Sequence, residues 1–515
     1  MGALVEKVTL TLQQLGADDF RSDAARLEEA LANAGFEGVR CTLNALRGLY
    51  PAAREGAIAV TLVHQADGVV ATRVQPADQS GPALGLACDL GSTSVSMELV
   101  EVVSGTTLAA ANAANEQIEH GTDILTRITY GLEGADARRD LQLAAIRTIN
   151  ALIDEVVAKA GVQAADVGVL VLSGNTTMQH MLLGLNAWPI FSAPFAPVTL
   201  NPGFIDAAEL ELNVACPVYF MPAASNYIGG DIMSGLLVAD FWRRDEVGLF
   251  FDVGTNGELV MGNKDWLLAG SGAAGPALEG YVSEHGMRAQ PGAIDSVCIE
   301  GAEVVYTTVD GAAPCGICGS GLIDLVAQMR LAGWMGIDGK LIAAASPTIR
   351  EVANPLVEGA TQLAVCYAPA TASATGEDLL FTQHDLGMYL ATKAAAFGMI
   401  DCMLGQVGFE PADIDQLTLT GAFPLHANLE HAITIGMFPD VPRERYSCLP
   451  NASLQGAHLL LCDRTKLADL EYLTSHVYTL QFAFMPEFVE CMAAARFVPH
   501  TDTTRFPTVM QQLQQ

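Results

Sequence analysis

The sequence predicts an α/β protein in which two related lobes follow a small amino-terminal α/β domain. Three observations support this fold class. Residues 249–260 (LFFDVGTNGELV) have the pattern of a buried strand that ends at Asp252, turns through glycines and enters a second strand. Residues 86–100 (LACDLGSTSVSMELV) repeat this pattern around Asp89. The chain has 515 residues, more than one hydrophobic core normally supports, so at least two domains are expected.

The repeat extends beyond the two hairpins. Residues 161–174 (GVQAADVGVLVLSG) and 408–421 (GFEPADIDQLTLTG) each follow an apolar helical stretch, expected at 137–160 and 385–407. Both segments end in an apolar strand closed by a hydroxyl residue and a glycine. Each lobe should therefore contain a hairpin, a long helix, a strand and a glycine turn, which indicates an internal duplication. The predicted domains are residues 1–84, residues 85–246 for the first lobe, and residues 247–515 for the second lobe with its inserted segments.

Composition and charge exclude several classes of function. The formal net charge is −32 and the pI is about 4.5, so phosphate backbones and anionic membrane surfaces would be repelled. We therefore expect neither a nucleic acid nor a membrane as partner. No apolar run reaches the roughly 18 residues of a membrane span, and the first residues lack a signal-peptide pattern, so we expect a cytoplasmic protein. The 11 cysteines are scattered, which is typical of reduced thiols.

The small domain shows an alternation of strands and one amphipathic helix. The helix is expected over residues 23–34 and ends before Gly35. Strands are expected at residues 5–12, 57–63 and 68–74, and a short linker at residues 76–82. No catalytic pattern is present in this domain.

The turns that follow the two acidic strand ends have the composition of a phosphate-binding site. Backbone N–H groups hold phosphate well, and glycines let them approach without a side chain in the way. The sequence predicts that one polyphosphate is gripped from two sides by these turns, which are Gly91, Ser92 and Thr93 in the first lobe and Gly254, Thr255, Asn256 and Gly257 in the second.

The acidic residues are candidates for magnesium binding and catalysis. Mg²⁺ keeps much of its hydration and uses few carboxylates, so Asp89 and Asp252 are expected to hold it through water. Either aspartate, or Glu258, is a candidate to orient the attacking water. A single DLGST segment would be explained by a simple hairpin, whereas two copies within a longer repeat favour a nucleotide hydrolase.

The strands that close the repeat also end in candidate ligand residues. Ligands bind at the carboxyl ends of such strands, so Gly174 and Asn175 are expected to contact the nucleotide. Gly421, Ala422 and Phe423 are assigned to the adenosine side. Phe423 is either a stacking surface or an aromatic packed beside Pro424, and the sequence does not distinguish these.

Four motifs together resemble one known family. They are Asp89–Thr93, Asp252–Glu258, Ala274–Gly280 and Gly316–Asp324. This set resembles the reductive activators of corrinoid-dependent methyltransferase systems, which belong to the actin, sugar kinase and heat-shock ATPase superfamily. The resemblance covers nearly the whole chain. It implies a two-lobed actin-like ATPase with duplicated ribonuclease H-like lobes, and it adds Gly319, Ser320 and Gly321 to the nucleotide contacts.

The resemblance implies an ATP-dependent reduction of cob(II)alamin to cob(I)alamin on a partner corrinoid protein. The chain lacks an Asp-x-His-x-x-Gly corrinoid motif, which agrees with a corrinoid held by the partner. Two other functions remain open at this point. One is a small-molecule kinase of the same superfamily, and the other is a nucleotide-gated activator or chaperone without redox chemistry.

The cysteines depart from the family pattern. Such activators usually begin with a ferredoxin domain whose four cysteines hold a [2Fe–2S] cluster, whereas this sequence has only Cys41 before Cys88. A separate ferredoxin-like electron donor is therefore expected. Cys315 and Cys318 form the one C-x-x-C spacing, which is interpreted as a [4Fe–4S] site shared across a homodimer, as a thiol redox pair, or as a glycine turn that starts a helix at residues 321–329. A homodimer is expected from the resemblance.

Overall fold

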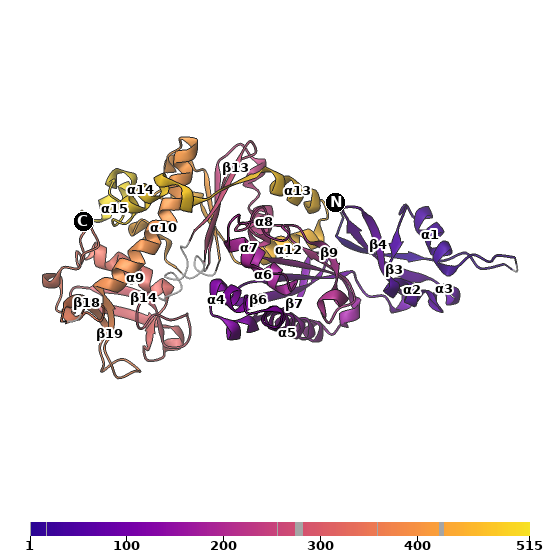
Figure 1. Cartoon of the computed structure of the whole chain (residues 1–515), viewed down its shortest axis with the longest axis horizontal. Coiled ribbons are helices and arrows are strands. Elements are labelled where there is room, and N and C mark those ends of the chain that lie inside the picture. The colour runs from indigo at the N-terminus through magenta and orange to yellow at the C-terminus, as the bar shows by residue number, and fades with distance from the viewer. Residues whose placement is uncertain are drawn as a thin grey trace. The chain divides into compact units, whose positions relative to one another are not determined.

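The computed structural model describes residues 2–16, 18–254, 256–272, 282–357, 359–421 and 427–514 (Figure 1). The chain forms two compact units. The first comprises Met1–Ala239 together with Ala452–Val477, and the second comprises Asp240–Asn451 together with Tyr478–Gln515. The predicted boundaries assigned residues 452–477 to the second lobe, whereas these residues pack in the first unit.

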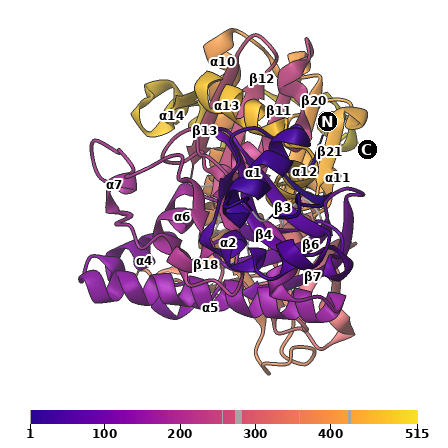
Figure 2. The ribbon, with the colours of Figure 1, turned by 90° about the vertical axis from the view of Figure 1, so that its right-hand side faces the viewer.

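The amino-terminal part of the first unit is a small α/β fold, seen in front in Figure 2. Its sheet has the order β1-β3-β4-β2. Leu27 and Leu31 of the first helix are fully buried against this sheet, and Ser22 caps that helix by accepting from the Ala25 N–H. The elements are β1 (Val5–Leu10), α1 (Asp23–Asn33), β2 (Arg40–Cys41), α2 (Leu43–Leu49), α3 (Ala52–Glu55), β3 (Ile58–Gln65) and β4 (Gly68–Pro76). The predicted helix and the three predicted strands are therefore present, with ends shifted by one to two residues.

The first lobe contains a six-stranded sheet of order β7-β6-β5-β8-β10-β9. The pairs β7–β6, β6–β5 and β10–β9 are antiparallel, whereas β5–β8 and β8–β10 are parallel. The strands are β5 (Leu84–Leu90), β6 (Ser94–Glu101), β7 (Thr106–Ala114), β8 (Val167–Gly174), β9 (Gly203–Asp206) and β10 (Pro217–Phe220). The helices of this lobe are α4 (Ile124–Gly131), α5 (Ala135–Ala160), α6 (Thr176–Leu182), α7 (Trp188–Phe191) and α8 (Gly230–Ala239).

The two faces of this sheet are covered by different helices. Side chains alternate along a strand, so Leu86, Cys88 and Leu90 of β5 face the core formed with α5. The intervening residues of β5 face α12 (Ala452–Cys462), because a Cβ at Gly85 would lie 2.6 Å from the Leu461 side chain. Asp89 therefore points toward α12, a helix that returns from far along the chain. The other returning helix is α13 (Lys466–His476).

The second unit repeats the topology of the first lobe. Its main sheet has the order β21-β20-β11-β12-β13-β22, in which the first five strands correspond to β10-β8-β5-β6-β7. The central strand is parallel to β20 and antiparallel to β12, as β5 is to β8 and β6. The strands are β11 (Gly248–Val253), β12 (Gly257–Gly262), β13 (Leu267–Gly272), β20 (Gln416–Thr420), β21 (Tyr446–Leu449) and β22 (Val477–Leu480).

The long helices of the two units end in the same way. Helix α5 is capped by Gly161 with φ 68°, and α10 (Gln383–Val407) is capped by Gly408 with φ 70°, both in the left-handed region that glycine favours. After each cap, a 3₁₀ turn with a capping box leads into the next strand. The predicted duplication is therefore confirmed, and the fold is the two-lobed actin-like α/β fold.

The second unit also carries the expected inserted segments. Two three-stranded sheets have the orders β15-β14-β16 and β17-β18-β19. Their elements are β14 (Ala293–Glu300), β15 (Glu303–Thr308), β16 (Gly316–Ile317), β17 (Ile349–Ala353), β18 (Thr361–Ala368) and β19 (Leu379–Thr382). The remaining helices are α9 (Gly319–Leu331), α11 (Leu429–Thr434), α14 (Pro486–Ala495) and α15 (Pro507–Gln512). Within the described ranges, no helix is both long enough and apolar enough to cross a membrane.

A buried lysine fixes the carboxy-terminal segment to α10. Lys393 is fully buried, and its ammonium donates to the Phe497 carbonyl at 2.7 Å and to the carbonyls of Ala495 and Pro499. Burial lowers the pKa of Lys393 well below its ordinary value. The three carbonyls partly replace the hydration of the amine, so this side chain helps to hold the segment against α10.

Candidate active site

The first candidate strand end lies at Asp89, at the end of β5. Asp89 is partly exposed and pairs in register with Ser96 of β6 and Ser173 of β8. Its Oδ1 accepts a hydrogen bond from the Ser453 hydroxyl at 2.7 Å. The Ser453 and Ser234 hydroxyls each lie 2.8 Å from the Ser173 hydroxyl. One Asp89 oxygen is thus fixed by a network of three serines.

Ser453 was not among the residues predicted from the sequence. This residue lies in the first turn of α12, 364 positions from Asp89, and no motif surrounds it. Its role depends on the packing of α12 against β5 and α8, where a Cβ at Gly456 would lie 2.2 Å from the Ser234 carbonyl oxygen. The close helix contact brings Ser453 to the strand end.

The turn after Asp89 is tightly built. A Cβ at Gly91 would lie 2.5 Å from the Ser94 carbonyl oxygen, so only glycine fits without rearrangement. The fully buried Asn115 supports the turn from behind, since its Nδ2 donates to the Gly91 carbonyl at 2.9 Å and its backbone N–H donates to the Thr93 carbonyl at 3.0 Å. Ser92 and Thr93 remain partly exposed, as a phosphate-binding turn requires.

The neighbouring strand end at Gly174 and Asn175 starts a helix. A Cβ at Gly174 would lie 2.8 Å from the Leu90 carbonyl oxygen, which places β8 and β5 in close contact at their ends. The Asn175 side-chain oxygen caps α6 by accepting from the Met178 N–H at 2.9 Å. The Asn175 oxygen therefore has a structural role, and the nucleotide contact assigned to this residue stays a prediction.

A second carboxylate, which was not predicted from the sequence, lies beside Asp89. Asp231 is in the first turn of α8, and its Oδ1 accepts from the Ile232 N–H at 2.8 Å. Burial raises the pKa of Asp231 to about 7, the Ile232 N–H opposes this shift, and the nearby Asp89 charge adds to it. A carboxyl group with a pKa near neutrality is suited to accept a proton from water.

The local sequence explains how Asp231 reaches this position. The preceding Gly229 passes so close to the other strand end that a Cβ there would lie 2.6 Å from the Asn175 Cα and 2.8 Å from the Thr176 nitrogen. The pair Gly229-Gly230 directly before an acidic residue and an apolar helix was the available signal. Two glycines and an aspartate at a helix start indicate a close backbone approach to a site.

The second candidate strand end lies at Asp252 of β11. Asp252 is partly exposed and pairs in register with Thr420 of β20 and Glu258 of β12. Glu258 accepts from the Ser271 hydroxyl at 3.4 Å. Gly421 has φ 99°, and a Cβ there would lie 2.4 Å from the Val253 carbonyl oxygen and 2.8 Å from Asp252 Oδ1. Because Gly421 has no side chain, the space beside the Asp252 carboxylate stays open.

The turn after Asp252 is described only in part. The Gly254 N–H donates to the Asn256 carbonyl at 3.1 Å, and a Cβ at Gly254 would meet nothing closer than 3.8 Å. Gly257 begins β12. Thr255, Ala422 and Phe423, and the segment Ala274–Gly280, lie outside the described residues, so their assigned roles stay predictions.

The predicted contacts at Gly319, Ser320 and Gly321 lie in the first turn of α9. A Cβ at Gly321 would lie 2.4 Å from the Ile294 carbonyl oxygen, and the Ser320 hydroxyl donates to the Asp295 carbonyl at 2.8 Å. Both residues therefore hold α9 against β14. This packing accounts for Ser320 and Gly321 without a ligand, and the nucleotide role of Gly319, Ser320 and Gly321 stays a prediction.

The two cysteines of the C-x-x-C segment have separate contacts. The Cys315 thiol lies 3.7 Å from the Met287 sulfur, and the Cys318 thiol lies 3.3 Å from the Ser320 hydroxyl. Cys318 is only 3% exposed at the start of α9. Across the described part of the chain, no group of three or more His, Cys, Asp or Glu side chains could hold a metal ion. A buried Cys318 does not fit a cluster shared at a surface, and the arrangement favours the glycine turn.

Both strand ends fit a magnesium-bound nucleotide. Each has a partly exposed aspartate, a strand partner with a hydroxyl group, and glycines at positions where a Cβ would strike the backbone. Oxygen ligands of this kind suit Mg²⁺ held through water, and the glycine turns suit phosphate. The fold and these strand ends define the class of the protein, a member of the actin, sugar kinase and heat-shock ATPase superfamily.

The family models identify the protein more closely. The model described as the C-terminal domain of RACo, the ASKHA domain, matches residues 246–510. The models of the RACo middle region and the RACo linker region match residues 84–244 and 1–81. This chain belongs to the RACo family.

Individual relatives agree with this assignment. A solved structure named reductive activator for corrinoid, iron-sulfur protein is 34% identical, with a TM-score of 0.84, over 98% of this chain and 81% of the other. The corrinoid activation enzyme RamQ of Eubacterium limosum is 29% identical over 416 residues, 80% of this chain and 70% of the relative. A methylated amine-specific corrinoid protein reductase of Methanosarcina barkeri is 41% identical over 86 residues, 17% of this chain and 16% of the relative.

Proposed function

We propose that this protein is an ATP-dependent reductive activator of a corrinoid protein. The observation that carries the proposal is the similarity over 98% of the chain to a reductive activator for a corrinoid, iron-sulfur protein. The relatives named as a corrinoid activation enzyme and as a corrinoid protein reductase support it. The partly exposed aspartates at the two strand ends agree with ATP as the energy source.

The reaction transfers one electron from a donor to the cobalt of the partner, which changes cob(II)alamin into cob(I)alamin. This reduction is thermodynamically unfavourable with cellular electron donors. Each factor of ten in the equilibrium constant of a one-electron transfer corresponds to about 59 mV, or about 1.4 kcal/mol. ATP binding and hydrolysis supply the free energy. ATP can drive the reduction only if the two are coupled. The conformation that the nucleotide stabilises must bind one oxidation state of the corrinoid better than the other.

In the first unit, we assign binding and proton transfer to two carboxylates. Asp89 would hold the hydrated magnesium ion, and the Ser453 hydroxyl at 2.7 Å keeps its carboxylate in one orientation. Asp231, whose pKa is raised to about 7, would orient the attacking water and accept its proton. The N–H groups of the turn Gly91–Thr93 would bind phosphate oxygens.

In the second unit, we assign binding to a carboxylate pair and a glycine. Asp252 would share the hydrated magnesium ion, and Glu258, opposite it in register, is a second candidate to orient water. The backbone at Gly254, Thr255, Asn256 and Gly257 would bind phosphate, and Gly421 would allow the adenosine to approach, followed by Ala422 and Phe423. One nucleotide would use groups of both units.

The electron donor and the assembly are finer parts of this proposal. We assign the electron to a ferredoxin-like donor protein. We also propose a homodimer, on the resemblance of the motif set to corrinoid activators. Sedimentation velocity would test it, since a single species of 54.2 kDa would contradict the dimer.

The proposal is tested by mixing the protein with MgATP, a low-potential reductant and a cob(II)alamin-loaded corrinoid protein, chosen among those encoded near its gene. The absorbance of cob(I)alamin should rise only with ATP, and phosphate release should accompany it. Equal cob(I)alamin formation without ATP would overturn the proposal. ATP consumption in proportion to a phosphorylated small molecule would indicate a kinase, and partner binding that is independent of the cobalt state would indicate a nucleotide-gated chaperone.

A further inference from the structure

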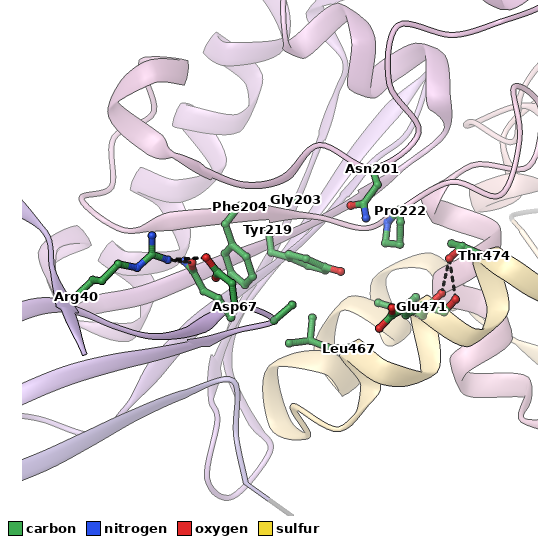
Figure 3. Close-up of a pocket in the computed structure, with 13 residues that line it drawn as sticks. Arg40, Asp67, Asn201, Gly203, Phe204, Tyr219, Pro222, Leu467, Glu471 and Thr474 are labelled. Atoms are coloured by element: carbon green, nitrogen blue, oxygen red, sulfur yellow. Dashed lines mark hydrogen bonds and ion pairs between the residues drawn. The ribbon is translucent and has the colours of Figure 1, made fainter. Parts of the chain in front are cut away.

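A cavity of about 560 Å³ lies in the first unit, away from the Asp89 strand end. Its walls come from three parts of the chain, which are β2 and the β3–β4 turn of the small domain, the edge strand β9 of the lobe with its neighbour β10, and helix α13 (Figure 3). Pockets that bind small organic ligands typically have volumes of about 300–1,000 Å³. None of the residues assigned to nucleotide or magnesium lines this cavity.

The floor of the cavity is an aromatic pair. Phe204 and Tyr219 are directly opposite in the antiparallel register of β9 and β10, so both side chains project from the same face of the sheet. Their ring centroids lie 4.7 Å apart with an interplanar angle of 45°. The alternate residues Val218 and Phe220 point to the other face, where they are buried in the core with α5. The pair therefore presents aromatic surface to the cavity.

The hydroxyl of Tyr219 points into the cavity. Tyr219 is only 7% exposed, and its hydroxyl makes no hydrogen bond to any described residue. Figure 3 shows the ring lying along the cavity with its oxygen directed toward the end formed by Asn201, Pro222 and Glu471. Burial raises the pKa of Tyr219, so the group stays an O–H. A hydroxyl that opens into a cavity is available to hydrogen-bond a ligand bound there.

The charges of the lining leave one carboxylate uncompensated. At one end, the Arg40 guanidinium pairs with the Asp67 carboxylate at 2.9 Å. At the other end, Glu471 projects from α13, and its carboxylate forms no ion pair with the described residues. The apolar side chains of Leu467 and Pro222 lie between the two ends. Aromatic faces beside a free carboxylate are the combination that binds organic cations.

We propose that this cavity binds a small organic cation of the amidinium or guanidinium class with a flat or apolar body. The cationic end would pair with Glu471, and one of its N–H groups would donate to the Tyr219 oxygen. The body would lie on the faces of Phe204 and Tyr219. This site is independent of the proposed ATP-dependent reduction.

The test is a fluorescence titration of the full chain with p-aminobenzamidine, whose emission rises in apolar surroundings. One probe per chain should bind, and free agmatine, an aliphatic guanidinium, should displace it. Glu471→Gln should weaken binding about tenfold, the effect of losing one favourable charge pair. Tyr219→Phe should weaken it about threefold, because one hydrogen bond is lost. Glu209→Gln, an exposed glutamate of the same unit outside the cavity, is the matched control and should bind like the unchanged protein.

Four results would overturn the proposal. They are absence of probe binding, equal binding by Glu471→Gln and Glu209→Gln, displacement of the probe by a non-hydrolysable ATP analogue, and binding of basic peptides without binding of the free amidine. Thermal melts monitored by circular dichroism identify variants that fold poorly. Because Glu471 is exposed, its variant is expected to melt as the unchanged protein does.

Discussion

The strand ends at Asp89 and Asp252 share one topology but differ in what surrounds the carboxylate. Asp89 accepts from Ser453 and lies near Asp231, whose pKa is raised to about 7. Asp252 lies opposite Glu258 and directly beside Gly421. The duplication has therefore kept the framework, whereas the groups around the two carboxylates differ. We infer that the first unit provides the proton acceptor and the second provides close backbone approach.

The largest effect is expected for Asp89→Asn and Asp252→Asn. Each should reduce ATP hydrolysis and cob(I)alamin formation about 10²–10³-fold, because a carboxylate assigned to the hydrated magnesium ion is lost. Phosphate release and cobalt absorbance measure the two activities. Asp18→Asn and Asp265→Asn, exposed aspartates of the two units, are matched controls and should retain activity. Loss of activity in only one of these two variants would contradict the view that both strand ends serve the same nucleotide.

The next effect concerns Asp231 of the first unit. Asp231→Asn should reduce the rate of ATP hydrolysis about 10²-fold, the usual contribution of a positioned base. The unchanged protein should lose activity as the pH falls through about 7, where Asp231 becomes protonated. The variant should lack this dependence. An unaltered pH profile in the variant would remove Asp231 from the proton transfer.

The same residue predicts a pH dependence of stability. The folded-state pKa of Asp231 is raised from 3.8 to about 7, so the unfolded chain ionises first as the pH rises. Stability is therefore lost between pH 3.8 and about 7 and stays reduced above that range. Asp231→Asn should raise the free energy of unfolding by about 1–3 kcal/mol at about pH 8 and change it less at about pH 4. Denaturant unfolding at both pH values measures the difference.

A smaller effect distinguishes the glycines at corresponding strand ends. Gly421→Ala should destabilise the protein by about 2 kcal/mol, because φ is 99° and the new Cβ would lie 2.4 Å from a carbonyl oxygen. Gly174→Ala should cost about 1 kcal/mol, because its Cβ would lie 2.8 Å from the Leu90 oxygen without positive φ. Urea midpoints measure both values. The reverse order would contradict the role given to Gly421.

The smallest effect is expected for Ser453→Ala. The hydroxyl contributes one hydrogen bond to the Asp89 carboxylate, so the cost should be about 1 kcal/mol in stability and about fivefold in ATP hydrolysis. Ser475→Ala is the control, because that hydroxyl bonds within its own helix, to the Glu471 and Tyr472 carbonyls and to the His476 ring. Equal behaviour of the two variants would show that Ser453 does not position Asp89.

Much of the fold could be predicted because its signals are local. The helix-capping glycines Gly161 and Gly408 and the acidic strand ends at Asp89 and Asp252 each depend on a few consecutive residues. Because the same pattern occurs twice along the chain, the amino-acid sequence alone reveals the duplication. The strand order of both sheets agrees with it.

The remaining parts of the site could not be predicted because they depend on distant packing. Ser453 meets Asp89 only through the contact of α12 with β5 and α8. Asp231 had a local signal in Gly229-Gly230, but its raised pKa requires burial next to Asp89, which sequence spacing does not reveal. The residues after Cys318 show a different difficulty, because the packing of α9 against β14 also requires a small residue at Gly321, so the sequence does not separate packing from ligand binding there.

The central proposal is that one nucleotide would use groups of both units. Calorimetric titration of a non-hydrolysable ATP analogue with Mg²⁺ tests it most directly, using the unchanged protein, Asp89→Asn and Asp252→Asn. The account predicts one nucleotide per chain and an affinity that falls at least about tenfold in either variant. Two nucleotides per chain, or full affinity in one of the variants, would contradict it.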